Sequence, residues 1–236
     1  MHEMERVGAV VLAAGAGARM GNRPKCLLEF HGIPLIQRQL MALSGAGVVE
    51  QVVVLGHHAA RIQPVISDFP VTLVCNPDPA AGQVSSLRLG LRSLSSSIDT
   101  VLVALADQPL VNAQDILDLL GAYRQRPAGT SLVRADVDGQ PGNPVVFSIH
   151  VCKEILTSDP AFGGKQWQEA HPDQVHRWVS SNMHYCLDVD SPRDIELLAA
   201  RTGHRLHWPM DLAFQPVSAQ VEHSFQAAPQ PRCGAA

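Results

Sequence analysis

Charge of either sign is scarce in this sequence, and no stretch of it is long and apolar enough to cross a membrane. Charged residues make up 17% of the 236 residues, and the formal net charge is -4. The sequence therefore shows no basic region of the kind that binds nucleic acid. The first residues also lack the basic region, apolar stretch and small-residue cleavage site of a signal peptide. We expect a soluble protein with no nucleic-acid or membrane partner.

Paired cysteines are absent as well. The five cysteines form no CxxC pair and no Cys/His ligand spacing, and their number is odd. Scattered cysteines of this kind are typical of reduced thiols, so we expect a cytoplasmic protein. Among the eleven histidines only His57 and His58 are adjacent. Because adjacent side chains diverge on helices and on strands, we interpret this pair as loop and helix-start residues rather than metal ligands.

Apolar, β-branched runs recur through the first part of the chain, with helical patterns between them. Continuous apolar runs, in contrast to alternating ones, favour strands that are buried on both faces of a mostly parallel sheet. Such runs cover residues 7–13, 51–55, 71–75, 100–106 and 131–135. Helices are expected at residues 34–44, around the stripe Leu87, Leu91 and Leu94, and from an Asn112 cap to about Tyr123. The pattern predicts a Rossmann-like, three-layer α/β/α fold.

The second half of the chain has a weaker pattern. An Asp138-Gly139 turn precedes QPGNPVVF, and an irregular helical region follows over residues 148–172. We expect substrate-specific insertions in this part. A further strand is predicted at residues 185–189, followed by a helix that ends near Ala200.

That last helix has a recognisable start, with Ser191 as N-cap, Pro192 at the first position and Asp194 at the third. We predict one α/β domain at residues 1–203 and a C-terminal tail at residues 204–236. The tail contains four prolines and is expected to be partly ordered or disordered.

A glycine-rich loop follows the first predicted strand, over residues 12–25. Its GxGxxxG spacing fits a dinucleotide fold poorly, and Asn22 after Gly21 excludes a Walker A loop, which needs Lys and then Ser or Thr at that point. Small residues would instead allow the backbone amides to surround a polyphosphate, with Arg19 and Lys25 supplying positive charge. A tight turn with two solvated cations remains the alternative.

Three aspartates follow predicted strands and are candidate metal ligands. Asp107 comes directly after an apolar run, at the carboxyl end of a central strand, where open α/β sheets place their sites. Asp188 and Asp190 share one side of the last predicted strand. Mg²⁺ prefers carboxylate oxygens of this kind. The alternatives are a strand-ending turn for Asp107 and stabilisation of a helix N-terminus for Asp188 and Asp190.

The loop LAAGAGARMGNRPK resembles the signature LAAGxSxRMG, followed by Lys, of the MobA-like nucleotidyltransferases, which include the molybdenum-cofactor guanylyl- and cytidylyltransferases. Four later segments resemble further motifs of that family, in the same order. They are NPDPAAGQVSSLRLGL for the nucleotide segment, LVALADQPLV for the metal segment, GQPGNPVVF for the substrate segment and DVDSPRD for the closing motif. The five motifs cover residues 10–194 and are together specific for the superfamily.

The resemblance implies a nucleotidyltransferase fold, Mg²⁺ as cofactor, and a nucleoside triphosphate and a phosphorylated acceptor as partners. It implies Asp107 and Asp190 as metal ligands, with Lys25 at the α-phosphate and Arg19 at the leaving pyrophosphate. Gly142 and Pro144 would contact the acceptor. The nucleotide would bind the segment that begins at residue 12 and the start of a later helix, through Leu12, Ala13, Ala14, Gly15, Gly82 and Ser85. Ser85 and Ser86 have an alternative role as first-turn residues of that helix.

Among the branches of the family, the motifs are most similar to the cytidylyltransferases, which transfer CMP from CTP to molybdopterin. The sequence departs from them at Gly163-Gly164-Lys165, where the family commonly has GDxGAR, and this leaves the acceptor open. The alternatives are a GTP-dependent or sugar-phosphate nucleotidyltransferase and a non-catalytic molybdenum-cofactor carrier that docks on a molybdoenzyme. Arg88 and Arg92 are expected to form a solvated helix edge.

Overall fold

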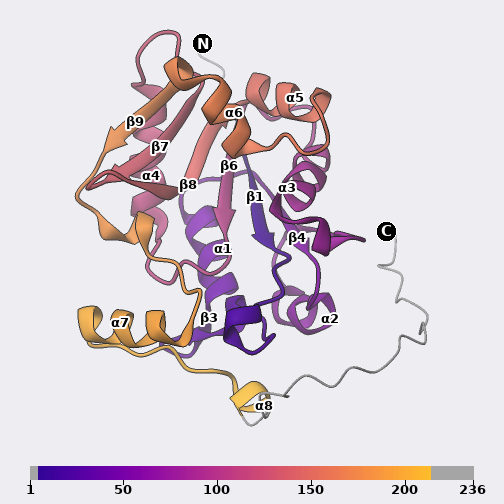
Figure 1. Ribbon diagram of the computed structural model, residues 1–236, viewed down its shortest axis with the longest axis vertical. Helices are drawn as coiled ribbons and strands as arrows, with labels where there is room; N and C mark the ends of the chain where they lie inside the picture. The colour runs from indigo at the N-terminus through magenta and orange to yellow at the C-terminus, as the bar shows by residue number, and fades with distance from the viewer. Residues whose placement is uncertain (1–4, 214–236) are drawn as a thin grey trace.

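The computed structural model describes residues 5–213 and shows one seven-stranded sheet with helices on both faces (Figure 1). The strand order is β5-β4-β1-β6-β8-β7-β9. The strands of this sheet are β1 Val7–Ala13, β4 Glu50–Leu55, β5 Thr72–Cys75, β6 Thr100–Leu105, β7 Leu132–Val137, β8 Gln140–Ser148 and β9 Val175–Val179. A separate two-stranded sheet pairs β2 (Glu29–Phe30) with β3 (Ile33–Pro34). The α/β class and the mostly parallel sheet are thereby confirmed.

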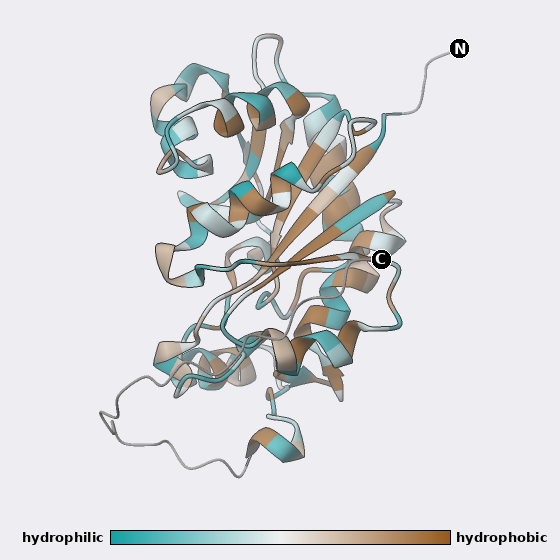
Figure 2. Ribbon diagram, turned by 90° about the vertical axis from the view of Figure 1, so that its right-hand side faces the viewer, coloured by the Kyte–Doolittle hydropathy of each residue, from teal (hydrophilic) through white to brown (hydrophobic). Residues whose placement is uncertain are grey.

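The centre of the sheet is built from the apolar runs that the sequence displays. β1 pairs in parallel with β4 on one side and with β6 on the other. Both faces of these strands are covered, which is why their sequences are apolar at consecutive positions and not at alternate ones. Figure 2 shows the strands as predominantly hydrophobic ribbons inside a more hydrophilic outer layer.

Two hydrophobic layers separate the sheet from its helices. On one face α1 (Leu35–Gly45) and α4 (Ala113–Arg124) pack against the sheet, and on the other α3 (Gln83–Arg92), α5 (Ile149–Thr157) and α6 (Gly164–Ala170) do so. The predicted cap of α4 is present, because the Asn112 side chain accepts hydrogen bonds from Gln114 N and Asp115 N, and Asp115 accepts one from Asn112 N. α2 is short (Ala59–Ile62).

The sequence pattern did not predict β8 and β9. β8 lies inside the sheet, antiparallel to both β6 and β7, although its first residues include Pro141, Gly142 and Pro144. These residues are poor strand formers, so local propensity does not predict a strand here, and tertiary packing stabilises one. The Asp138-Gly139 turn is correct: both residues have positive φ, of 52° and 79°, and join β7 to β8.

The predicted strand at residues 185–189 is wrong. A 3₁₀ turn (Met183–Cys186) occupies the start of this segment, and its remainder joins the end of β6 through the hydrogen bond from Val189 N to Asp107 O, at 3.2 Å. The Tyr185 side chain is buried and donates to Asp115 O at 2.7 Å. A buried side chain and one backbone contact fix this segment without a strand ladder.

The predicted helix after Ser191 is present as α7 (Pro192–Thr202), with the Ser191–Asp194 capping box, and it ends two residues beyond the predicted Ala200. Beyond it, His207 pairs with Glu29 and Leu206 is buried, and α8 (Met210–Ala213) follows. The domain boundary at residue 203 stays a prediction, and residues 214–236 of the predicted tail lie outside the described residues. Within residues 5–213 no helix combines the length and apolar character that a membrane span requires.

Candidate active site

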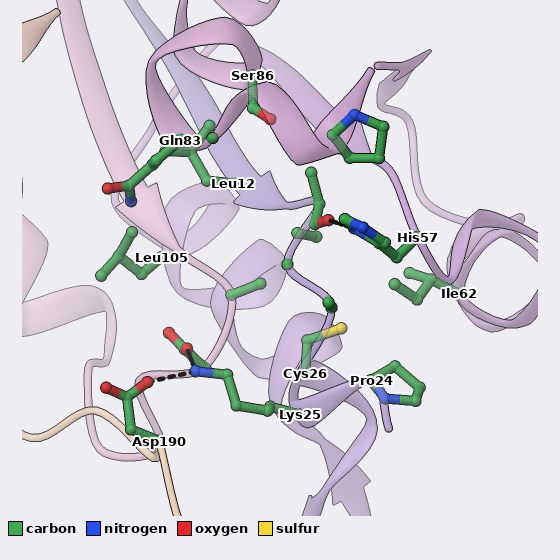
Figure 3. Close-up of a pocket in the computed structure, with 18 of the residues that line it drawn as sticks. Leu12, Pro24, Lys25, Cys26, His57, Ile62, Gln83, Ser86, Leu105 and Asp190 are labelled. Carbon is green, nitrogen blue, oxygen red and sulfur yellow. Dashed lines mark hydrogen bonds and ion pairs between the residues drawn. The ribbon is translucent and has the colours of Figure 1, made fainter. Parts of the chain in front are cut away.

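A cavity of about 650 Å³ opens at the carboxyl ends of β1 and β6. This volume falls in the range of small-molecule sites. Its walls come from the segment after β1, from the segment after β6, from the start of α3 and from the segment before α7. Figure 3 shows Lys25 and Asp190 at one end of the cavity and Ser86 at the other, with Leu12 and Leu105 between them.

Lys25 lies between two carboxylates at one end of this cavity. Its Nζ is 2.7 Å from Asp107 Oδ2 and 2.5 Å from Asp190 Oδ1 (Figure 3). Burial alone would lower the pKa of Lys25, but the Asp107 carboxylate and then Asp190 outweigh burial and raise the pKa above its ordinary value of 10.5. The structure therefore brings together three of the residues singled out from the sequence, from three distant parts of the chain.

Asp190 and its neighbour Asp188 differ in charge environment. Burial would raise the pKa of Asp190, but its hydrogen bond with Lys25 and the charges of Lys25 and Arg19 hold that pKa below its ordinary value of 3.8. For Asp188, burial raises the pKa, and the charges of Asp190 and Asp107 raise it further. Stability from the Asp190 ion pairs is present above pH 3.8 and is lost only as the pH falls through the lowered folded-state pKa.

Arg19 lies at the rim of the site. Its Nη2 is 2.5 Å from Asp190 Oδ2, and 69% of its side chain is exposed. The side chain is thus directed to the carboxylate cluster, while Arg19 is not among the residues that line the cavity. An exposed ion pair of this kind contributes little to stability, so the guanidinium is free to exchange its partner for another anion.

The glycine-rich loop lines the cavity through Leu12, Ala13, Ala14 and Gly15, as the sequence predicts. Two histidines contact the backbone of this loop: His57 Nδ1 lies 3.0 Å from Ala14 O (Figure 3), and His58 Nε2 lies 2.8 Å from Ala16 O. His57 also lines the cavity. The two histidines occupy the predicted loop and helix-start positions, and they bind backbone carbonyls. The sequence does not indicate these contacts between the histidine rings and the loop carbonyls, because the two segments are far apart in the chain.

Only some residues of the nucleotide segment at the start of α3 line the cavity. Gly82, Gln83 and Ser86 line the cavity, whereas Ser85 does not. The Ser85 hydroxyl donates to Gly82 O at 2.8 Å and accepts from Asn76 Nδ2 at 2.8 Å. Ser85 therefore has the first-turn role that the sequence left as an alternative.

Gly142 and Pro144, the predicted acceptor residues, are buried and do not line this cavity. A Cβ at Gly142 would lie 2.7 Å from Tyr185 Cβ and 3.1 Å from Ala135 Cβ. Gly142 thus permits the close approach of Tyr185 to the sheet. In the described structure both residues therefore pack against neighbouring residues.

The buried cysteine in the cavity wall is not suited to nucleophilic chemistry. Burial and, to a smaller extent, the nearby Asp107 charge raise the pKa of the Cys26 thiol to about 12. A thiol with such a pKa remains protonated at neutral pH. Charge placement around Lys25, Asp107 and Asp190 is therefore the chemically active feature of this cavity.

Two carboxylate features make the site suitable for a divalent cation. Asp107 Oδ1 is buried and has no hydrogen-bond partner, while Oδ2 contacts Lys25. Asp190 lies across the same ammonium group. Hard oxygen ligands with an unsatisfied atom fit Mg²⁺, which usually takes one or two carboxylates and completes its shell with phosphate oxygens and water.

Gly17→Ala is expected to distort the loop. Gly17 has a φ of +65°, and a Cβ there would lie 2.0 Å from the Arg23 carbonyl oxygen. We expect a loss of about 2–3 kcal/mol in the free energy of unfolding and a nucleotide KM raised about tenfold, measured by denaturant unfolding and initial rates.

Gly47→Ala is the matched control, because Gly47 has a φ of +80° and no atom within 4 Å of the added Cβ. It should lose about 1 kcal/mol through backbone strain and leave the nucleotide KM unchanged. Equal effects of both substitutions on KM would contradict a positioning role of the Gly17 turn.

The comparisons with known proteins agree with this fold. Residues 9–175 match the MobA-like NTP transferase domain. This span exceeds half of the chain, so the protein belongs to the MobA-like NTP transferase family. A solved homologue of Mycobacterium tuberculosis Rv0371c from Mycobacterium sp. strain JC1 is similar in structure, with a TM-score of 0.69 and 26% identity over 83% of this chain and 96% of that chain.

Three curated relatives are similar over about half of the chain. They are the bifunctional protein GlmU of Kineococcus radiotolerans (37% identity; 48% of this chain, 24% of the relative), CMP-5'-(3-aminopropyl)phosphonate synthase of Streptomyces rubellomurinus (33%; 56% and 23%) and nicotine blue oxidoreductase of Paenarthrobacter nicotinovorans (35%; 50% and 57%). The matched region spans between about a quarter and just over half of the length of these relatives. Their names describe different chemistries, so the substrates of this chain do not follow from them.

Proposed function

We propose that this protein transfers CMP from CTP to molybdenum-loaded molybdopterin, with release of pyrophosphate. The observation that carries the nucleotidyl-transfer chemistry is the contact of Lys25 with both Asp107 and Asp190 at the end of a nucleotide-sized cavity. The five motifs similar to the cytidylyltransferase branch support the choice of substrates. A relative named as a CMP-phosphonate synthase supports a cytidine nucleotide.

In this proposal the nucleotide lies along the cavity, with its base near Ser86 and its phosphates near Lys25. Small residues of the loop allow the main chain to approach the ligand closely. Gln83, on the wall that Figure 3 shows next to Leu12, offers an amide for the base. Gly82 has a φ of 93° and open space at its Cβ position, which leaves its backbone accessible.

Asp107 and Asp190 would hold Mg²⁺, which would supply positive charge to the substrate phosphates. Within residues 5–213 no group of three or more His, Cys, Asp or Glu side chains is arranged to hold a metal ion. The two aspartates would therefore depend on phosphate oxygens and water for the remaining ligands. Carboxylate donors and the unpartnered Asp107 Oδ1 fit such a partly solvated ion.

The chain's own residues act by position and charge. A phosphate oxygen of the acceptor attacks the α-phosphate of CTP in line, the new phosphorus–oxygen bond forms as the bond to pyrophosphate breaks, and no protein nucleophile is needed. Lys25 neutralises the charge that develops on the α-phosphate. Arg19, which the Asp190 carboxylate holds at the rim, binds the leaving pyrophosphate through its forked donors.

Other acceptors and another class of function are the alternatives. The similarity to GlmU and to a phosphonate synthase favours a different phosphorylated or phosphonate acceptor. A carrier of molybdenum cofactor that docks on a molybdoenzyme through the tail is the non-catalytic alternative. Deleting residues 214–236 would leave α8 in place; an enzyme should keep its turnover, and a docking protein should lose its partner.

Pyrophosphate release tests the proposal. We would measure Mg²⁺-dependent release with CTP, GTP, UTP and ATP in turn, with and without molybdenum-loaded molybdopterin. We expect release with CTP and the pterin together and with no other pair. Release with GTP would show that the nucleotide is GTP and not CTP. Release only with a sugar phosphate or a phosphonate would show that the acceptor is a different one. No release with any pair would favour the carrier.

A further inference from the structure

One row of paired residues crosses the sheet from the cavity side to its far edge. Val10 pairs with Val103, Val103 with Val145, Val145 with Arg134, and Arg134 with Arg177. Paired residues of neighbouring strands direct their side chains to the same face of a sheet. The two arginines therefore lie side by side on β7 and β9, on the face to which Val10 belongs.

This face is also the one that forms the cavity wall. Leu12 and Leu105 lie two residues beyond Val10 and Val103 on the same strands, and both line the cavity. Neighbouring strands are about 4.8 Å apart, so β7 lies roughly 10 Å from β6 across β8. Figure 1 shows β8, β7 and β9 extending the sheet beyond β6, away from β4.

Within residues 5–213, two nitrogens of the Arg134 guanidinium lack a hydrogen-bond partner. Its Nε and Nη1 are buried and form no hydrogen bond, and among residues 5–213 no ion pair joins Arg134 or Arg177 to a carboxylate. Burial lowers the pKa of Arg134, the Arg177 charge lowers it further, and the Asp136 and Cys186 charges oppose these effects. Two like charges at paired positions are destabilising.

Other partly buried arginines of this protein are satisfied. Arg88 donates to main-chain carbonyls of the segment around α5, and Arg126 donates to Thr130 O and Tyr123 O while it stacks on the Tyr123 ring. Arg134 therefore differs from Arg88 and Arg126 in having buried nitrogens without a hydrogen-bond partner. Arg177 is exposed and Arg134 is partly buried, so solvent reaches this pair from the Arg177 side.

We propose that Arg134 and Arg177 form a subsite for an oxyanion group of the acceptor, at the end of the acceptor away from the phosphate that attacks CTP. Two guanidinium groups offer forked donors that match a tetrahedral or planar oxyanion. Because β7 lies roughly 10 Å from β6 across the sheet, the acceptor in this proposal carries two separate anionic groups, one near Lys25 and one on β7 and β9. This inference rests on the proposed nucleotidyl transfer and names the charge pattern of its acceptor.

Inorganic phosphate is the probe for this subsite. Its dissociation constant would be measured by isothermal titration calorimetry, with the nucleotide cavity filled by a non-hydrolysable CTP analogue and Mg²⁺. We expect Arg134→Gln and Arg177→Gln each to weaken phosphate binding about tenfold, and Arg134→Lys to retain part of it. Arg177 is exposed, so its substitution provides a variant whose folding should be unaffected.

Arg92→Gln is the control, because Arg92 is an exposed arginine on α3. It should bind phosphate as the wild type does. Equal affinities in all variants, or no phosphate binding to the wild type, would overturn the subsite. If phosphate binding depends on Arg134 and Arg177 while molybdopterin gives no pyrophosphate release, the subsite stands and the proposed acceptor is wrong.

Discussion

Asp107→Ala is expected to lower kcat for nucleotidyl transfer about 1,000-fold while the protein remains folded. Asp107 follows β6 directly, one of its oxygens contacts Lys25 at 2.7 Å, and the other is buried without a partner. The substitution removes a proposed metal ligand and the carboxylate that affects the pKa of Lys25 most. Asp107 is small and borders the cavity, so its truncation leaves little new empty space. The measurement is pyrophosphate release with the substrates that the wild type uses.

Asp68→Ala is the matched control for this prediction, because Asp68 is exposed and its carboxylate contacts only the neighbouring Ser67 hydroxyl. It should leave kcat and the melting temperature unchanged. Undiminished turnover of Asp107→Ala would remove the proposed metal site. A large fall in its melting temperature would show that the aspartate acts through the fold and not through the chemistry.

Arg88→Ala is expected to lower the free energy of unfolding by about 3–5 kcal/mol. Arg88 is 6% exposed, and its guanidinium donates to carbonyl oxygens at the end of α5 and beyond it: Ile155, Leu156, Ser158, Asp159 and Phe162. The substitution leaves several buried carbonyls without donors and a cavity beneath them. Equilibrium unfolding in urea measures the loss.

Arg92→Ala is the control on the same helix, four residues away. Arg92 is exposed in the last turn of α3, so its loss should change stability by about 0.5 kcal/mol at most. Arg88→Lys should recover only part of the stability, because an ammonium group cannot reach so many separate carbonyls. Equal stabilities of Arg88→Ala and Arg92→Ala would contradict this account.

The two arginines also show where sequence reasoning fails. The spacing of Arg88 and Arg92 predicts a solvated helix edge, and this is correct for Arg92 and wrong for Arg88. Helical periodicity locates a residue on a face, but whether that face meets solvent depends on α5, which comes more than fifty residues later. The burial of Arg88 is a tertiary effect with no local signal.

The fold itself was predictable where strands are buried on both faces. β1, β4 and β6 follow apolar runs, and their bounds differ from the prediction by no more than one residue. β8 was not predictable, because its two prolines and a glycine are tolerated only through contacts such as that of Gly142 with Tyr185. Local propensity and tertiary packing disagree in this strand, and packing prevails.

The candidate site was predictable as a set of residues but not as a geometry. Motif spacing singled out Lys25, Asp107 and Asp190, yet nothing in the spacing indicates that one ammonium group contacts both carboxylates. The clamp that His57 and His58 place on the loop was missed for the same reason. Such contacts depend on how the sheet brings distant loops to one edge.

The shared ammonium group of Lys25 limits how this site can change through mutation. Losing Lys25 would leave Asp107 and Asp190 facing each other without a counter-charge, so the effects of substitutions at these three positions should be strongly non-additive. A neutral residue at one of these positions changes which substitutions the other two positions accept. Divergence at this edge of the sheet is therefore confined to coordinated replacements, and Arg19 shares this constraint because it contacts Asp190 as well.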